Sequence, residues 1–270
     1  MGYAHALGQM PAIMLFRLIP VVMENLIKCI SITPQTRKWS GSRREAVKSL
    51  TSICSKMTVY SSQTPRLTCY NEVVTVMKAF LDAISDYTVT DHGDIGALLR
   101  EAAMEGLQTL LCLTAEQAVE LLTPELVSDI VMSLVQQSVE CIDRTRGVAG
   151  RVFSTLLKAD SKVPYIPAEA EVRKIFTPEA CDACTWTKAC ESFCLFVPLL
   201  KFPEYTRSLL LGLITSIGGV SESLADEVSK MTFDLLLQQN IEEKKRIADT
   251  IIDIFEEYFQ QDRIVIPFLS

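Results

Sequence analysis

Apolar residues recur at helical spacing along nearly the whole chain, whereas the alternation typical of strands is almost absent. The spacing predicts helices at about 10–30, 42–58, 69–87, 94–113, 123–141, 143–159, 185–200, 204–218, 221–239 and 241–260. Thr123-Pro124-Glu125 and Thr177-Pro178-Glu179 each offer a side-chain acceptor, a proline and a carboxylate, as helix starts do. We therefore expect an all-α protein.

Within the predicted helices, an arginine repeatedly leads an apolar stripe. The stripe positions follow Arg43, Arg100 and Arg146 by three, seven and ten residues in each case, and a weaker fourth copy begins at Arg207. A unit that repeats along one chain indicates stacked helical pairs and not a closed globular domain. The sequence therefore predicts a HEAT/armadillo-like helical-repeat solenoid, an α–α superhelix.

The helical positions of these arginines suggest what they do. At about 100° per residue, Arg100 lies at the edge of the apolar face of its helix. An arginine there can lay its methylenes on apolar surface and direct its guanidinium at a carboxylate of a neighbouring turn, which Asp91 or Asp94 could supply. We expect Arg43, Arg100 and Arg146 to be structural repeat positions that brace adjacent units.

The longest predicted loop is a connector at residues 160–167. Pro164 and Pro167 prevent helix there, so we expect a rigid, extended segment. It could divide the solenoid into two subarrays, residues 1–159 and 168–270.

Composition narrows the class of partner. The chain carries 26 basic and 33 acidic residues, a net charge of -7, which argues against a nucleic acid bound through its phosphates. Nine cysteines, an odd number scattered through helical patterns, are typical of a reducing compartment and not of a secreted disulfide framework. No apolar run is long enough to suggest a membrane span. A protein partner in the cytosol fits these features.

The strongest candidate for a metal site is a group of four cysteines, Cys181, Cys184, Cys190 and Cys194. Four thiolates could bind zinc. The two pairs, however, lie closer in sequence than the halves of zinc ribbons and fingers do, and the second pair has helical spacing. Buried thiols that act as small hydrophobes explain the pattern as well, so we expect no metal and no cofactor.

No catalytic motif stands out, since the chain has only two histidines and lacks a nucleophile elbow, a P-loop, a dinucleotide fingerprint and a metalloprotease helix. A binding scaffold is the better interpretation. The candidate contact residues are Asp91, His92 and Asp94 in a polar turn and the outward-pointing Arg144 and Arg151, because loops and exposed charges often carry binding. For each of them, the alternative is an ordinary solvated surface.

Four segments resemble the C-terminal region of the tubulin-folding cofactor D family. They are GYAHALGQMP (2–11), SDYTVTDHGDIGALLREAAM (85–104), DRTRGVAGRVF (143–153) and LLLGLITSIGGVSES (209–223). They follow one another in the family's order, and the resemblance extends over essentially the whole chain. The four-cysteine group does not resemble the family's pattern.

The resemblance implies that residues 1–270 are a C-terminal HEAT-like segment of a longer protein, as a fragment or a truncated gene product. It implies capture of β-tubulin and support of α/β-tubulin heterodimer assembly and disassembly with tubulin-folding cofactors E and C and an Arf-like small GTPase. It places the protein in the cytoplasm and microtubule cytoskeleton. GTP hydrolysis would be stimulated in tubulin, so the chain itself would not be an enzyme. The alternative is a HEAT-repeat scaffold for another protein complex.

Overall fold

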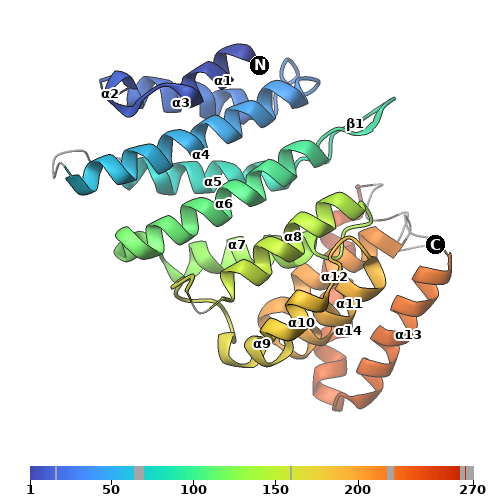
Figure 1. Cartoon of the computed structure of the whole chain (residues 1–270). Helices are drawn as coiled ribbons and strands as arrows, with labels where there is room; N and C mark the ends of the chain where they lie inside the picture. Colours follow the sequence, from blue (N-terminus) through green and yellow to red (C-terminus); the bar gives the residue numbers. More distant parts are fainter. Residues whose placement is uncertain (16, 64–69, 159, 218–221, 262–264, 266–270) are drawn as a thin grey trace. The chain divides into compact units, whose positions relative to one another are not determined.

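The computed structural model describes residues 1–15, 17–63, 70–158, 160–217, 222–261 and 265 (Figure 1). These residues form fourteen α-helices, two short 3-10 helices and a pair of two-residue strands. The prediction of an all-α helical-repeat solenoid is confirmed. The chain forms two compact units, each described here by itself: Met1–Ile130 with Ala159–Tyr165, and Val131–Lys158 with Ile166–Ser270.

The first unit is built around three long helices of 24, 15 and 21 residues, α4 (Ser40–Gln63), α5 (Tyr70–Ile84) and α6 (Ala97–Gln117). Its other elements are α1 (Gly2–Gln9), α2 (Ala12–Leu15), α3 (Ile19–Ile30), β1 (Val89–Thr90), β2 (Gly93–Asp94), η1 (Val119–Leu121) and the first half of α7 (Pro124–Gln137). The helices α4 and α6 lie side by side, α1 and α3 pack on α4, and α5 packs on α6 (Figure 1). The residues three, seven and ten positions after Arg43 and Arg100 are fully buried in this core.

The second unit holds the rest of α7 and an aromatic core. Its further elements are α8 (Asp143–Leu156), α9 (Glu169–Ile175), α10 (Pro178–Ala183), α11 (Ala189–Phe196), η2 (Val197–Lys201), α12 (Pro203–Ile217), α13 (Glu222–Gln238) and α14 (Ile241–Tyr258). The rings of Phe153, Phe176 and Phe196 meet pairwise, with centroids 4.9 to 5.2 Å apart, and Trp186 lies 6.3 Å from Phe196. Edge-on packing of this kind adds to the stabilisation that burial provides.

Glycine permits a close approach to a helix in each unit. A Cβ on Gly106 of α6 would lie 2.5 Å from the Phe80 ring of α5 and 2.7 Å from Thr51 Oγ1 of α4. A Cβ on Gly150 of α8 would lie 2.4 Å from the ring of Trp186. Because real Cβ atoms do not approach other atoms so closely, α6 can lie this near to α4 and α5, and α8 this near to the turn that holds Trp186, only at a residue without a side chain.

The prediction of one helix over residues 10–30 is wrong. The structure has α2 and α3 instead, ending at Leu15 and starting at Ile19, and it adds α1 before them. Proline lacks an amide donor, and its ring collides with the carbonyl four residues earlier, so it fits only the first helical turn. Pro11 immediately precedes α2 and Pro20 lies in the first turn of α3, which explains the interruption.

Two short helices, α9 and α10, lie where no helix was predicted. At seven and six residues, they are too short to show a helical period in the sequence. The helix start at Thr177 was recognised, and the Thr177 hydroxyl accepts a hydrogen bond from the amide of Ala180 at 3.2 Å. The predicted helix at 185–200 is shorter, because α11 passes into the 3-10 turn η2.

The connector at residues 160–167 has no regular secondary structure, in agreement with its two prolines. The chain turns there, since Lys162, Tyr165 and the following Ala168 have φ angles of 54°, 62° and 47°. Such left-handed conformations are uncommon in residues with a Cβ. The predicted extended conformation is therefore wrong for this segment, and its role as a divider of two subarrays stays a prediction.

Candidate protein-binding site

The predicted polar turn is the tip of a small β-hairpin. Asp91 and His92 connect β1 to the antiparallel β2, and both are exposed to solvent. Gly93 has a φ of 87°, a left-handed conformation that glycine adopts without strain. Val89 is 61% exposed. The hairpin extends beyond the helices of the first unit and presents this tip to solvent (Figure 1).

The buried guanidinium of Arg100 fixes the base of the hairpin. Its Nη1 donates to Asp94 Oδ2 at 2.9 Å and to the carbonyl oxygen of Asp86 at 2.8 Å. The guanidinium carbon lies 4.3 Å from the centroid of the Tyr87 ring, which adds a cation–π contact. Of the two carboxylates considered from the sequence, Asp94 pairs with Arg100, and Asp91 stays in the exposed turn.

Arg43 reaches the same loop from α4. Its Nη1 lies 2.6 Å from Asp86 Oδ2 in an ion pair whose side chains are 1% and 0% exposed, and its Nε donates to the Ile30 carbonyl at 2.8 Å. Asp86 Oδ1 accepts from the amide and the hydroxyl of Thr88 at 3.0 and 2.6 Å. Asp86 therefore links Arg43, through its carboxylate, to Arg100, through its carbonyl.

Arg146 makes the corresponding contacts in the second unit. Its Nη1 donates to the carbonyl oxygens of Glu140 and Cys141 at 2.6 and 3.3 Å, and its Nη2 donates to Asp143 Oδ1 at 2.5 Å. The Thr187 carbonyl accepts a further hydrogen bond from Nη2. The side chain is 1% exposed, so these partners replace most of the water that the guanidinium loses on folding, and only Nε is buried without a hydrogen-bond partner among the described residues.

The three arginines share one role at the ends of helices. Arg43 donates to the last residue of α3, Arg100 to a carbonyl two residues after α5, and Arg146 to carbonyls shortly after α7. The final carbonyls of a helix lack partners within the helix and carry a partial negative charge. Arg43 meets this need directly at the Ile30 carbonyl, whereas Arg100 and Arg146 bind carbonyls of the loops that follow α5 and α7. Each arginine thus joins the start of its helix to the end of the preceding helix or to the loop just after it.

The weaker fourth copy at Arg207 does not share this geometry. Its side chain is 42% exposed and pairs with Glu257. Arg246 of α14 donates instead to the carbonyl of Leu200 near the end of η2, at 3.2 Å. The offset pattern misled here because Arg207 faces α14 and solvent, whereas the position at the helix end is taken by an arginine distant in sequence.

The other two candidate contact residues, Arg144 and Arg151, lie exposed on α8. They belong to the second unit, whereas the hairpin tip belongs to the first. We therefore treat them as two separate candidate surfaces. Their part in binding stays a prediction.

The four cysteines gather around α10 and α11, with Cys194 exposed and the other three partly buried. Burial, followed by the negative charge of Glu191 and then the neighbouring thiols, raises the pKa of Cys184 to about 11. Such a thiol stays protonated at neutral pH. In the part of the chain that the structure describes, no three Cys, His, Asp or Glu side chains are grouped as a metal site.

We expect Cys184 to react with iodoacetamide about tenfold more slowly than an unperturbed thiol at pH 8. The raised pKa lowers its thiolate fraction about 100-fold, and the greater nucleophilicity of a more basic thiolate recovers about tenfold. Its rate should rise with pH up to about pH 11, which peptide mass spectrometry can follow, with Cys184→Ser identifying the signal. A rate that levels off below pH 9, or one equivalent of zinc in the purified protein, would contradict this description.

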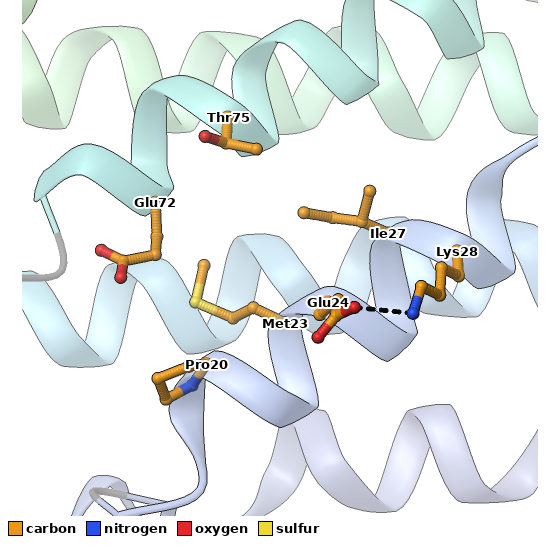
Figure 2. Close-up of a pocket in the computed structure, with 7 residues that line it drawn as sticks. All are labelled: Pro20, Met23, Glu24, Ile27, Lys28, Glu72 and Thr75. Carbon is orange, nitrogen blue, oxygen red and sulfur yellow. Dashed lines mark hydrogen bonds and ion pairs between the residues drawn. The ribbon is translucent and has the colours of Figure 1, made fainter.

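A surface that the sequence did not indicate lies between α3 and α5. A hollow of about 430 Å³ there is lined by seven residues, which Figure 2 draws as sticks: Pro20, Met23, Glu24, Ile27, Lys28, Glu72 and Thr75. The sequence pattern that could have indicated this hollow is on α5, where acidic and small residues share one face of the helix.

Among the helices that the structure describes, none is long and apolar enough to cross a bilayer.

Comparison with known proteins identifies the family. The family described as "Tubulin folding cofactor D C terminal" matches residues 128–270, more than half of the chain. The chain belongs to the tubulin-folding cofactor D family. A relative within the comparison, the tubulin-specific chaperone D of Dictyostelium discoideum, is 26% identical over 200 residues. That match covers 67% of this chain and 14% of the relative, and no solved structure matches.

Proposed function

We propose that this chain is a protein-binding part of a tubulin-folding cofactor that captures β-tubulin and supports assembly and disassembly of the α/β-tubulin heterodimer. The observation that carries the proposal is the family match over residues 128–270. In this proposal the chain acts in the cytoplasm and on the microtubule cytoskeleton, with cofactors E and C and an Arf-like small GTPase. It stimulates GTP hydrolysis by tubulin as part of that complex and performs no bond chemistry itself.

The physical character of the chain supports a stoichiometric binding role. Repeat helices present large surfaces from a rigid frame, and the buried arginine contacts stiffen that frame at the helix ends. Several apolar side chains are exposed on α1, α2 and α3 and the turn between them, among them Tyr3 at 91%, Ile13 at 71% and Val21 at 59%. Exposed apolar surface of this kind is typical of contact with another protein segment.

The test is capture of purified α/β-tubulin by the immobilised 270-residue chain. We expect Arg144→Glu with Arg151→Glu to lower the retained tubulin about tenfold, because reversing two interface charges costs about 1.4 kcal/mol or more. Lys230→Glu, a reversal at another exposed position of the second unit, is the control and should retain tubulin like the unmodified chain. Asp91→Lys tests the hairpin tip in the same way without disturbing Asp94.

Unchanged retention after both reversals on α8 would remove Arg144 and Arg151 from the contact surface. Failure of the unmodified chain to retain any tubulin, together with stoichiometric recovery of a different complex from cells, would favour the alternative of a scaffold for that complex.

A further inference from the structure

A groove runs between α3 and α5 in the first unit, which we name the α3–α5 groove. It consists of two hollows of about 430 and 290 Å³ that both include Ile27. The α3 side and the turn after it contribute the apolar Pro20, Met23, Ile27, Ile30 and Ile32, and the α5 side contributes Glu72, Thr75, Ala79 and Asp82. Three charged residues also line it: Glu24 and Lys28 of α3, which pair with each other, and Arg43 of α4, which pairs with Asp86. The α3 wall is therefore mainly apolar and carries the Glu24–Lys28 ion pair, whereas the α5 wall is small and acidic; Figure 2 shows the part of both walls around Ile27.

The spacing on α5 explains why the groove stays open. Glu72, Thr75, Ala79 and Asp82 are three, four and three residues apart, which places them on one face of the helix. Thr75 and Ala79, in the middle of that face, are too small to fill the space opposite Ile27. Of the apolar α3 wall, Pro20 and Ile32 are exposed and Ile27 is half-buried, whereas Met23 and Ile30 belong to the core. Covering the first three would be favourable by about 25 cal/mol per Å² of apolar area.

The charges of the groove are uneven. Glu24 is compensated, since Lys28 Nζ lies 2.6 Å from its carboxylate (Figure 2). Glu72 and Asp82 form no ion pair with any residue that the structure describes, and Glu72 Oε2 is buried without a hydrogen-bond partner. Because ten residues of helix rise about 15 Å, the groove has an uncompensated carboxylate toward each end, about 15 Å apart.

We propose that the α3–α5 groove binds an amphipathic helix of a protein partner that carries Lys or Arg at both ends of its apolar stripe. The apolar face of this helix covers Pro20, Ile27 and Ile32, and its basic side chains reach Glu72 and Asp82. A helix laid along the groove meets both carboxylates when its basic residues are ten or eleven positions apart, on one face. This inference goes beyond tubulin capture and does not depend on it.

The charge of the groove decides between partners. An anionic segment would meet two uncompensated carboxylates, and like charges across an interface are costly. A purely apolar helix would cover the α3 wall but desolvate the accessible parts of the Glu72 and Asp82 carboxylates with no donor or positive charge beside them, which is unfavourable. A basic amphipathic helix covers the apolar wall and also pairs with both carboxylates.

The proposal is tested with a synthetic peptide and the full 270-residue chain. The probe is a fluorescein-labelled helix of about 18 residues with leucines at i, i+3, i+4 and i+7 spacing and two arginines eleven positions apart. A matched peptide carries glutamate in place of both arginines. We expect fluorescence anisotropy to show at least about tenfold tighter binding of the basic peptide, and hydrogen exchange to slow in α3 and α5.

Variants of the chain locate the contact. Glu72→Gln with Asp82→Asn removes the charges with little change of shape and should weaken the basic peptide about tenfold. Glu72→Lys with Asp82→Lys should make the acidic peptide the tighter ligand. Glu105→Lys, a reversal at an exposed position of α6, is the control and should leave the affinity unchanged. Circular dichroism establishes that each variant keeps its helices.

Three results would overturn the proposal. They are no binding of the basic peptide up to about 1 mM, equal affinity for both peptides, and an affinity that Glu72→Gln with Asp82→Asn leaves unchanged. Protection that appears outside α3 and α5, with none inside them, would place the peptide elsewhere and count equally against it.

Discussion

Replacement of Asp86 by alanine lowers the free energy of unfolding of the first unit by an expected 3–5 kcal/mol, roughly the cost of removing one partner of a buried ion pair. Arg43 is 1% exposed and would keep its charge with no carboxylate beside it. Thr88 would lose its acceptor as well. The effect should therefore exceed that of an ordinary polar substitution several-fold.

Urea denaturation followed by circular dichroism measures the loss, and hydrogen exchange in α4 and α6 assigns it to the first unit. Asp91→Ala is the matched control, because it removes the same side chain from the exposed tip of the hairpin and should cost less than about 0.5 kcal/mol. Equal losses for the two variants would mean that the Arg43–Asp86 pair contributes nothing to stability.

Phe196→Ala should destabilise the second unit by about 3–5 kcal/mol, the usual range for removal of a buried aromatic ring. Phe196 is 0% exposed, and its ring contacts those of Phe153, Phe176 and Trp186. The cavity left behind would be lined by three rings held by different segments, so the site cannot easily collapse to fill it.

The fluorescence of Trp186 reports on this core directly. The other tryptophan, Trp39, lies in the first unit, and replacing it by phenylalanine leaves a single signal. Phe233→Ala, at a ring that is 60% exposed, should change the unfolding free energy by no more than about 0.5 kcal/mol. A Phe196→Ala loss as small as this control's would contradict the assignment of the aromatic cluster as the centre of the core.

The repeat could be predicted from the sequence because the same structural requirement produces the same pattern in each copy. A buried stripe must recur at helical spacing, and an arginine at a fixed offset ahead of it marks the helix start. Arg43, Arg100 and Arg146 all have this form, and the all-α repeat architecture followed from them. Arg207 has the same spacing without the same surroundings, since spacing along one helix does not record which helix end lies opposite.

The features that could not be predicted from the sequence depend mostly on contacts between two different elements. Asp86 lies in a loop, where no periodicity distinguishes a buried carboxylate from a solvated one, and its role appears only when Arg43 is beside it. The α3–α5 groove likewise arises from small side chains on one helix facing apolar ones on another. The hairpin strands are two residues long, too short for alternation to show, although their turn was recognised.

The arginine contacts also show that the way in which consecutive helices are joined does not depend on the length of the loop between them. Arg43 and Arg100 lie 13 and 14 residues after the carbonyls they bind, whereas Arg146 lies only six residues after the carbonyl of Glu140. Each joint is made by the same guanidinium-to-carbonyl contact, so the residues between can be added or removed at only the modest entropic cost of a longer loop. The connection before Arg100 holds the hairpin, although it is only one residue longer than the one before Arg43. These loops are therefore the places where the chain can diverge toward new partners, or be grafted by design, while the helical frame stays unchanged.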